Sequence, residues 1–135
     1  MRILTLVRLV GACIFGFGVS AQAHHSHAMF DHDREVTITG KVSELVFTNP
    51  HVFLYVDVED EQGEVVKYWI EMSNIPNMIR RGIGAKTFEA GDVVTVNMYP
   101  LRDGRPGGNY VTIVGPDGRI YDCCLLYTSP SPRDS

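Results

Sequence analysis

Histidine is concentrated near the start of this chain, in the stretch AHHSHAMFDH. Four of the five histidines in the protein lie there: His24, His25, His27 and His32. Imidazole nitrogen is a preferred ligand of Cu(II) and Zn(II) in proteins. The stretch therefore indicates metal binding as the first chemistry to consider.

The strongest form of such a site needs a free N-terminus at His24. If a signal peptidase cuts after Ala23, the α-amine and the Nδ1 atom of His24 can chelate one Cu(II) ion. A third nitrogen would come from His25, or from His51 if the fold brings that turn close. Because these ligands bind without their protons, such binding weakens as the pH falls. We therefore predict a copper or zinc site built from His24, His25 and His51.

A second interpretation treats these histidines as a polar leader. Short His-rich termini often bind metals adventitiously, and a mobile terminus loses entropy when it is ordered. The histidine spacing matches neither a helical i, i+4 pair nor an H-E-x-x-H pattern. His32 lies between Asp31 and Asp33, so we expect it to be solvated. His51 follows an Asn-Pro turn and can serve as a turn residue with a local hydrogen bond.

An aromatic surface is the alternative from a different functional class. Phe53, Tyr55 and Trp69 fall on neighbouring predicted strands, and aromatic rings on a barrel face can bind a small molecule or a peptide. The competing interpretation places these rings in the core or over the outer face as cover. Arg102 and Arg105, in the loop RDGRPGG, could bind an anion or remain solvated.

Other functions are disfavoured by the composition. Residues 24–122 hold no cysteine and no G-x-S-x-G motif, which disfavours a nucleophilic enzyme. The acidic run EDEQGE lacks the alternating oxygen ligands of a calcium loop. The formal net charge of the chain is −4, whereas nucleic acid backbones are bound by Lys and Arg. We predict a binding protein rather than an enzyme, with a metal ion or a periplasmic protein and no nucleic acid as its partner.

The first 23 residues have the pattern of an export signal. Arg2 and Arg8 carry positive charge, and residues 3–19 are mostly apolar. Ala21 and Ala23 fit an A-x-A cleavage site. We therefore expect cleavage after Ala23, a periplasmic location and no stable membrane anchor after cleavage. A lipoprotein signal ending at Cys13 is the alternative, although it would leave an apolar remnant after the anchor.

The composition changes abruptly from Cys123 onward. The tail CCLLYTSPSPRDS resembles a translated sequencing-adapter artefact, and a natural disordered tail would also carry no fold. Cys123 and Cys124 are neighbours, which makes them a poor disulfide and a poor zinc site. The predicted organisation is a signal peptide at 1–23, a His-rich leader at 24–34, a barrel domain at 35–122 and this tail at 123–135.

Alternating apolar residues predict the elements that must position these side chains. We expect strands within residues 34–50, 51–60, 65–72, 93–98 and 109–115, with a short last strand at 120–121. Gly40, inside the first strand, indicates a bulge or a sharp bend. The segment 73–84 has the N-cap residues, the early proline and the closing glycines of a short helix.

Three strands, a helix and then two or three strands is the order found in an OB-fold. We therefore predict an all-β domain with one short helix, folded as a small OB-like, five- to six-stranded Greek-key barrel. A long first strand bent at a glycine suits this fold, because it can serve both sides of the barrel. An open antiparallel sandwich is the alternative.

Six motifs follow one another over residues 23–108: AHHSHAMFD, TITGKV, FTNPHVFLYVDV, PNMIRRG, GDVVTV and PLRDGRPGG. In this order they resemble domain-of-unknown-function family 6152, whose members are small exported bacterial proteins. The resemblance implies export, a compact β-rich domain, an HHS start at His24 and an NPH turn at His51, but no activity. The chain departs from the family at His27, where an aromatic residue is more common, and in EMSNIPN, where glycine is more common.

Overall fold

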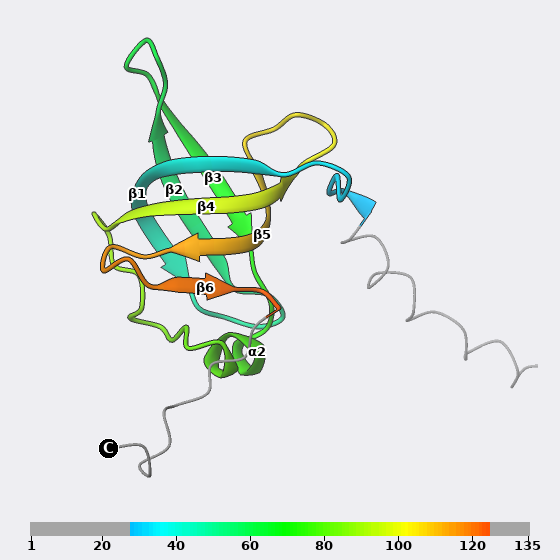
Figure 1. The fold of residues 1–135 in the computed structure, drawn as a ribbon, viewed down its shortest axis with the longest axis vertical. Helices are drawn as coiled ribbons and strands as arrows, with labels where there is room; N and C mark the ends of the chain where they lie inside the picture. Colours follow the sequence, from blue (N-terminus) through cyan, green and yellow to red (C-terminus); the bar gives the residue numbers. More distant parts are fainter. Residues whose placement is uncertain (1–27, 125–135) are drawn as a thin grey trace, which may run out of the picture.

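The computed structural model describes residues 28–124 and shows an all-β domain with one short helix (Figure 1). Five strands close into a barrel, because β3 pairs with both β2 and, in parallel, β5, and a sixth strand extends the sheet in the order β3-β2-β1-β4-β5-β6. This is the strand order of an OB barrel, which confirms the predicted fold and excludes the open sandwich. The elements are β1 (Val36–Val46), β2 (Phe53–Glu59), β3 (Val65–Glu71), α2 (Ile75–Arg80), β4 (Val93–Pro100), β5 (Gly107–Val114) and β6 (Ile120–Asp122).

Strand β1 serves both sides of the barrel, as its length and its glycine predicted. Its first half pairs with β4 and its second half with β2, and Lys41 has a partner in both strands. A Cβ atom on Gly40 would lie 2.4 Å from the backbone oxygen of Asp57, so only glycine fits where β1 passes against β2. Gly40 therefore marks the predicted bend, and a bulge follows between Val42 and Glu44.

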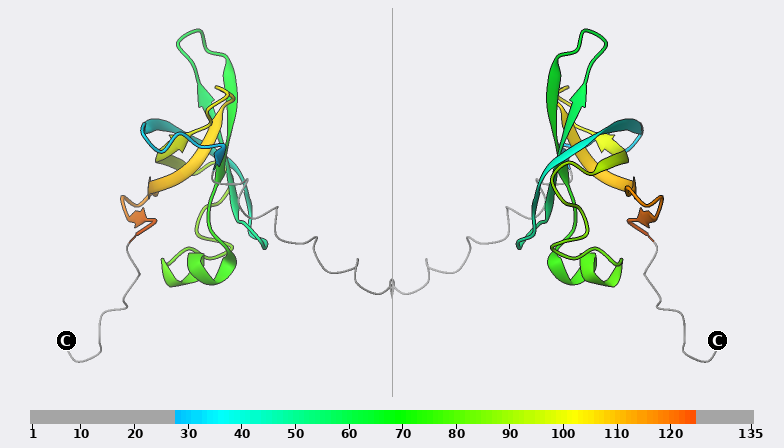
Figure 2. Two further views of the ribbon diagram at one scale, coloured as in Figure 1. Left: turned by 90° about the vertical axis from the view of Figure 1, so that its right-hand side faces the viewer. Right: turned by 90° about the vertical axis from the view of Figure 1, so that its left-hand side faces the viewer.

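The alternating apolar residues of the strands fill the barrel interior. Leu54, Val56 and Ile70 are fully buried, and the residues between them face outward, as an alternation of period two requires. Helix α2 lies across one end of the barrel (Figure 1), where its Met78 is fully buried. The hairpin of β2 and β3 rises at the end away from α2, as Figure 2 shows. The two ends of the barrel are therefore built differently.

Helix α2 is shorter than the predicted segment 73–84 but begins as predicted. The side chain of Asn74 accepts a hydrogen bond from the backbone N–H of Asn77 at 3.0 Å, and a proline lies in the first turn. Gly82 has a φ of 80°, the left-handed conformation that commonly ends a helix. Met78 is buried, whereas Ile79 is 58% exposed, so of these two neighbours only Met78 packs against the barrel.

The segment before β1 is held against the barrel. Phe30 is fully buried and forms an isolated β-bridge with Leu101. The N–H of Asp31 donates to the oxygen of Pro100 at 2.8 Å, and the N–H of Arg102 donates to the oxygen of Met29 at 2.9 Å. Residues 29–31 of the predicted leader are therefore hydrogen-bonded to the chain where β4 ends.

Part of what the sequence predicts lies outside the described residues. This holds for the signal peptide, the cleavage site after Ala23, Cys13, and the first histidines, His24, His25 and His27. At the other end, the N–H of Cys123 donates to the oxygen of Val111 at 2.9 Å, which continues the pairing along β5. Over residues 28–124, no helix is long and apolar enough to cross a membrane.

Candidate functional site

His51 lies two residues before β2, in a loop that is fixed on both sides. The side chain of Asn49, whose peptide bond to the next residue is cis, accepts a hydrogen bond from the N–H of Ile75 at 3.1 Å. This bond ties the loop to the first residue of α2. Val52, the next residue, is held by backbone hydrogen bonds to the segment that follows β3. The backbone around His51 is therefore well defined.

The imidazole of His51 is held by the carboxylate of Glu71, at the end of β3. His51 Nδ1 lies 2.5 Å from Glu71 Oε1. The Glu71 side chain is 9% exposed, whereas the His51 side chain is 36% exposed. A buried carboxylate requires a hydrogen-bond donor, and the Nδ1–H group supplies it. The second ring nitrogen, Nε2, is then the atom that His51 can offer to a ligand.

Glu71 is the residue that the metal hypothesis missed. Alternation along β3 predicts that it shares a face with Trp69, and in the structure its cross-strand partner is Phe53. An acidic residue on that face is normally solvated, but the His51 loop folds over the end of β3 and buries it. No local signal could have found it, because alternation along β3 places a residue between the buried Ile70 and Met72 on the outer face.

Aromatic rings lead from His51 to the segment before β1. The ring centroids of His51 and Phe53 are 6.5 Å apart, those of Phe53 and Trp69 6.0 Å, and those of Trp69 and Phe30 6.2 Å. Phe30 in turn lies 6.5 Å from His32. We call Phe53, Trp69 and Phe30 the aromatic row. It joins the His51 loop to the N-terminal segment along the outside of β2 and β3.

The three predicted aromatic residues lie on one outer face, and the tryptophan among them is partly covered. Phe53, Tyr55 and Trp69 are half-buried on the outer face of β2 and β3, and Tyr55 is the cross-strand partner of Trp69. None of the three belongs to the buried core inside the barrel. A Cβ atom on Gly107 would lie 2.9 Å from the indole Nε1, so this glycine lets Trp69 lie against the backbone of β5. Phe30 contacts the same indole ring.

The two loop arginines have different contacts. Arg102 Nε donates to the carbonyl oxygen of Phe30 at 3.0 Å, and a terminal nitrogen of Arg102 lies 3.9 Å from Asp31. Arg105 pairs with Asp103 at 2.8 Å in its own loop, and its backbone N–H and guanidinium lower the pKa of the Asp103 carboxyl. Arg102 thus holds the N-terminal segment in place, whereas Arg105 orders its loop.

One group of side chains in residues 28–124 has the spacing of metal ligands, and it is not the predicted one. The ligand atoms of Asp122, Cys123 and Cys124 lie within 4.8 Å of one another. Burial raises the pKa of the Cys123 thiol to about 11, which makes it harder for a metal ion to displace the thiol proton. The group therefore suits a metal poorly. Of the predicted set, His51 lies in the described range, while His24 and His25 lie outside it.

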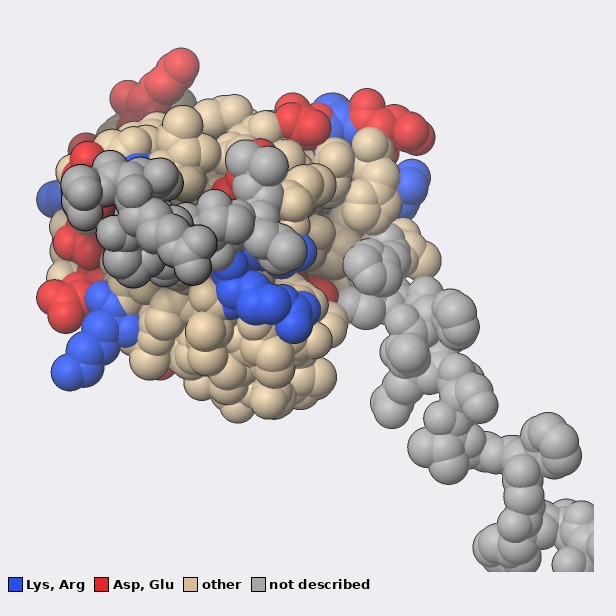
Figure 3. Space-filling view, turned by 60° about the horizontal axis from the view of Figure 1, so that its bottom comes forward, with Lys and Arg blue, Asp and Glu red and all other residues tan. Residues whose placement is uncertain are grey.

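Charges of both signs are mixed on the surface near α2. Figure 3 shows acidic and basic side chains interspersed on this face, with both kinds at its edge. A face of this kind carries no strong field of a single sign, whereas nucleic acid binding relies on clustered Lys and Arg. The exclusion of nucleic acid as a partner stays a prediction.

Comparison with known families gives one match. A family model described as "Family of unknown function (DUF6152)" matches residues 13–110, which is more than half of the chain. The matched range includes β1 to β4, the helix between them, His51, Glu71 and the aromatic row. None of the curated proteins compared with the chain is a match. The resemblance carried by the six motifs is thereby confirmed.

Proposed function

We propose that this chain, which belongs to domain-of-unknown-function family 6152, is an exported periplasmic protein that binds Cu(II) or Zn(II) through His24, His25 and His51. One observation carries the proposal: the buried carboxylate of Glu71 lies 2.5 Å from His51 Nδ1. Histidines that bind metals almost always donate their other ring N–H to a carboxylate, a carbonyl or water. This pairing fixes the ring and leaves Nε2 of His51 for a metal ion.

The other ligands would come from the chain that precedes the aromatic row. Phe30 is anchored against Trp69, and three ring-to-ring steps of 6.2, 6.0 and 6.5 Å join Phe30 to His51. His25 lies three residues before Ala28, the first residue that the structure describes, and three extended residues reach roughly 10 Å. The proposal requires this segment to bring His24 and His25 to His51 while Phe30 stays in place.

An N-terminal histidine would favour copper. Cleavage after Ala23 would free the α-amine of His24, and this amine and Nδ1 of the same residue would chelate Cu(II). The apolar stretch and the A-x-A motif before His24 support the cleavage. The proposed ligands are imidazoles and an amine, which suit Cu(II), whereas a thiolate site would suit Cu(I).

The test is a titration with Cu(II) and Zn(II) of two N-terminal forms of the full chain. One form is exported through its own leader so that His24 begins the mature protein, and the other carries one extra residue before His24. We expect stoichiometric, submicromolar Cu(II) binding in the first form. The extended form should bind roughly tenfold more weakly or worse, because its amine no longer shares a chelate ring with His24.

Matched variants complete this test. His51→Ala should weaken binding, whereas His32→Ala, which removes a histidine outside the proposed set, should leave the affinity unchanged. Weak binding that is equal in both N-terminal forms and in both variants would contradict the proposal. The His-rich stretch would then be a polar leader.

A metal-free interaction module is the second candidate function. Phe53 and Tyr55 are half-buried on the outer face of β2 and β3, so part of each ring remains open to a small molecule or a periplasmic protein. This hypothesis predicts that His24→Ala and His25→Ala leave the binding of the small molecule or protein unchanged. Tyr55→Ala should abolish that binding. Trp69→Ala should also abolish it, but that variant loses the contact with Phe30, so its fold must be checked by circular dichroism.

A further inference from the structure

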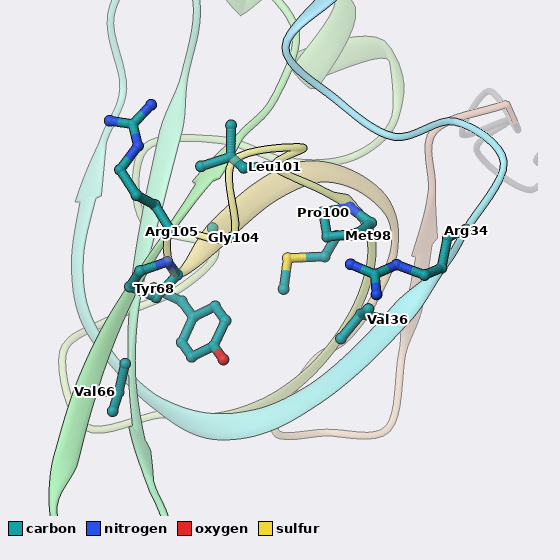
Figure 4. Close-up of a pocket in the computed structure, with 11 residues that line it drawn as sticks. Arg34, Val36, Val66, Tyr68, Met98, Pro100, Leu101, Gly104 and Arg105 are labelled. Atoms are coloured by element: carbon teal, nitrogen blue, oxygen red, sulfur yellow. The ribbon is translucent and has the colours of Figure 1, made fainter.

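The end of the barrel away from α2 contains a cavity of about 360 Å³ (Figure 4). Strands β1, β3 and β4 form its walls, and the loop at residues 104–107 lies at its rim. Helix α2 seals the opposite end of the barrel, as Figure 1 shows. None of His51, Glu71 and the aromatic row lines the cavity, so a ligand bound in it would be independent of the proposed metal site.

Part of the cavity wall is apolar and includes one aromatic ring. Val36, Val66 and Tyr68 are half-buried, and Met98 is 1% exposed. Figure 4 shows the ring of Tyr68 and the side chain of Met98 projecting toward each other from opposite walls. Covering the half-buried Val36, Val66 and Tyr68 with the apolar part of a ligand removes their exposed area from water, which favours binding.

One guanidinium, that of Arg34, is turned toward this cavity, and the Arg34 side chain is 63% exposed. Figure 4 shows the terminal nitrogens of Arg34 turned toward Met98, whereas the guanidinium of Arg105 points away. Arg34 approaches Asp31 through Nε at 4.0 Å, a long contact that leaves the terminal nitrogens able to bind another group. The residues that line the cavity include no Asp or Glu. The lining residues therefore carry two positive charges and no negative one, while Asp31 lies beside Arg34 and Asp103 beside Arg105.

We propose that the open end of the barrel binds a small organic anion, a monocarboxylate carried on a flat apolar body. The carboxylate pairs with the terminal nitrogens of Arg34, because a planar guanidinium and a carboxylate match in two parallel hydrogen bonds. The apolar body lies against Tyr68 and Met98. A volume of about 360 Å³ is near the lower limit for small-molecule sites, which suits a ligand with one ring.

The test uses benzoate as the probe and the full chain labelled with ¹⁵N for NMR titration. We expect saturable shifts confined to residues around the cavity, and none with benzyl alcohol, which has the ring but lacks the charge. Arg34→Gln should weaken benzoate binding roughly tenfold, because it removes a charge-assisted hydrogen bond. Lys86→Gln is the matched control, because it removes one positive charge at an exposed position beyond α2. It should leave the affinity for benzoate unchanged.

A second variant tests the cavity rather than the charge. Val66→Phe enlarges a side chain on the cavity wall beside Tyr68 and should abolish benzoate binding while the rest of the spectrum stays that of the folded protein. The proposal is overturned if benzoate shows no saturable binding. It is also overturned if Arg34→Gln and Lys86→Gln weaken binding equally, or if the shifts map to the outer face around Phe53 instead of the cavity.

Discussion

The two ends of the barrel differ in what covers them. At one end, α2 and the segment after it place Met78, Ile83 and Phe88 against the ends of the strands, and all three side chains are buried in the core. At the other end, the strands finish around an open cavity with Tyr68 on its wall. The difference indicates that the sealed end stabilises the barrel, whereas the open end remains free to bind.

The open end has a separate support on its outer side. Phe30 is fully buried and Leu101 is 1% exposed, yet neither belongs to the main core cluster. Both contribute to the contact between the N-terminal segment and the chain after β4. The comparison of the two ends therefore predicts a global effect when the sealed end is damaged and a more local effect when this support is removed.

The largest effect is expected at the sealed end. Met78→Ala should lower the free energy of unfolding by about 4 kcal/mol, because it opens a cavity under α2 that the barrel cannot fill. Ile79→Ala, at the exposed neighbouring position, should change stability by less than about 0.5 kcal/mol. Urea unfolding followed by the fluorescence of the single tryptophan measures both. Equal losses would mean that α2 does not seal the core.

Removing the outer support should lower the free energy of unfolding by a smaller amount. Phe30→Ala is expected to lower the free energy of unfolding by about 3 kcal/mol, because it deletes a buried ring that contacts Trp69. Hydrogen exchange should show faster exchange at the amides of Asp31 and Arg102, which bond this segment to the chain around Leu101. Faster exchange across the core strands as well would show that the two ends are not independent.

Alkaline pH should weaken the sealed end. Burial raises the pKa of Tyr110, whose hydroxyl lies 3.4 Å from Arg81 beside α2, to about 12. Below about pH 10 the phenol is neutral in both states. As the pH rises toward about 12, the unfolded chain ionises it while the folded chain keeps the proton, so about 2 kcal/mol of stability is lost.

Tyr110→Phe isolates this contribution. The variant should lose less stability between about pH 9 and pH 12 than the parent chain, as measured by urea unfolding at each pH. Part of the alkaline loss should remain, because burial also raises the pKa of Tyr121. An unchanged pH profile would show that Tyr110 is not protected from ionisation in the folded barrel.

The smallest expected effect concerns the His51 loop, beside the sealed end. Glu71→Gln keeps the shape of the side chain but removes the charge that orients His51 Nδ1, so the Cu(II) affinity of the mature protein should fall about tenfold. Titration of Cu(II) measures this change, with Glu89→Gln as a control that removes an exposed charge. An unchanged affinity would remove the support that Glu71 gives to the metal proposal.

The order of the elements could be predicted from the sequence because its signals are local. Alternating apolar residues predicted the strands, and an asparagine cap and two glycines predicted the short helix. Gly40 predicted the bend of β1, since a side chain there would collide with Asp57. His51 and the aromatic pair Phe53 and Trp69 were also found in this way, because residue type alone marks them as chemically useful.

The partners of these residues could not be predicted, because they come from distant parts of the chain. Glu71 is an ordinary acidic residue until the loop before β2 folds over it and places His51 Nδ1 within hydrogen-bond distance.

Phe30 looks like part of a leader until the chain after β4 pairs with it and buries its ring. By itself, the sequence determined the strands, the helix and the family, because alternation, caps and motif order are properties of neighbouring residues. Only the tertiary structure decided which end of the barrel is sealed and which groups meet, because closing the sheet through β3 and β5 brings together residues that no local pattern connects.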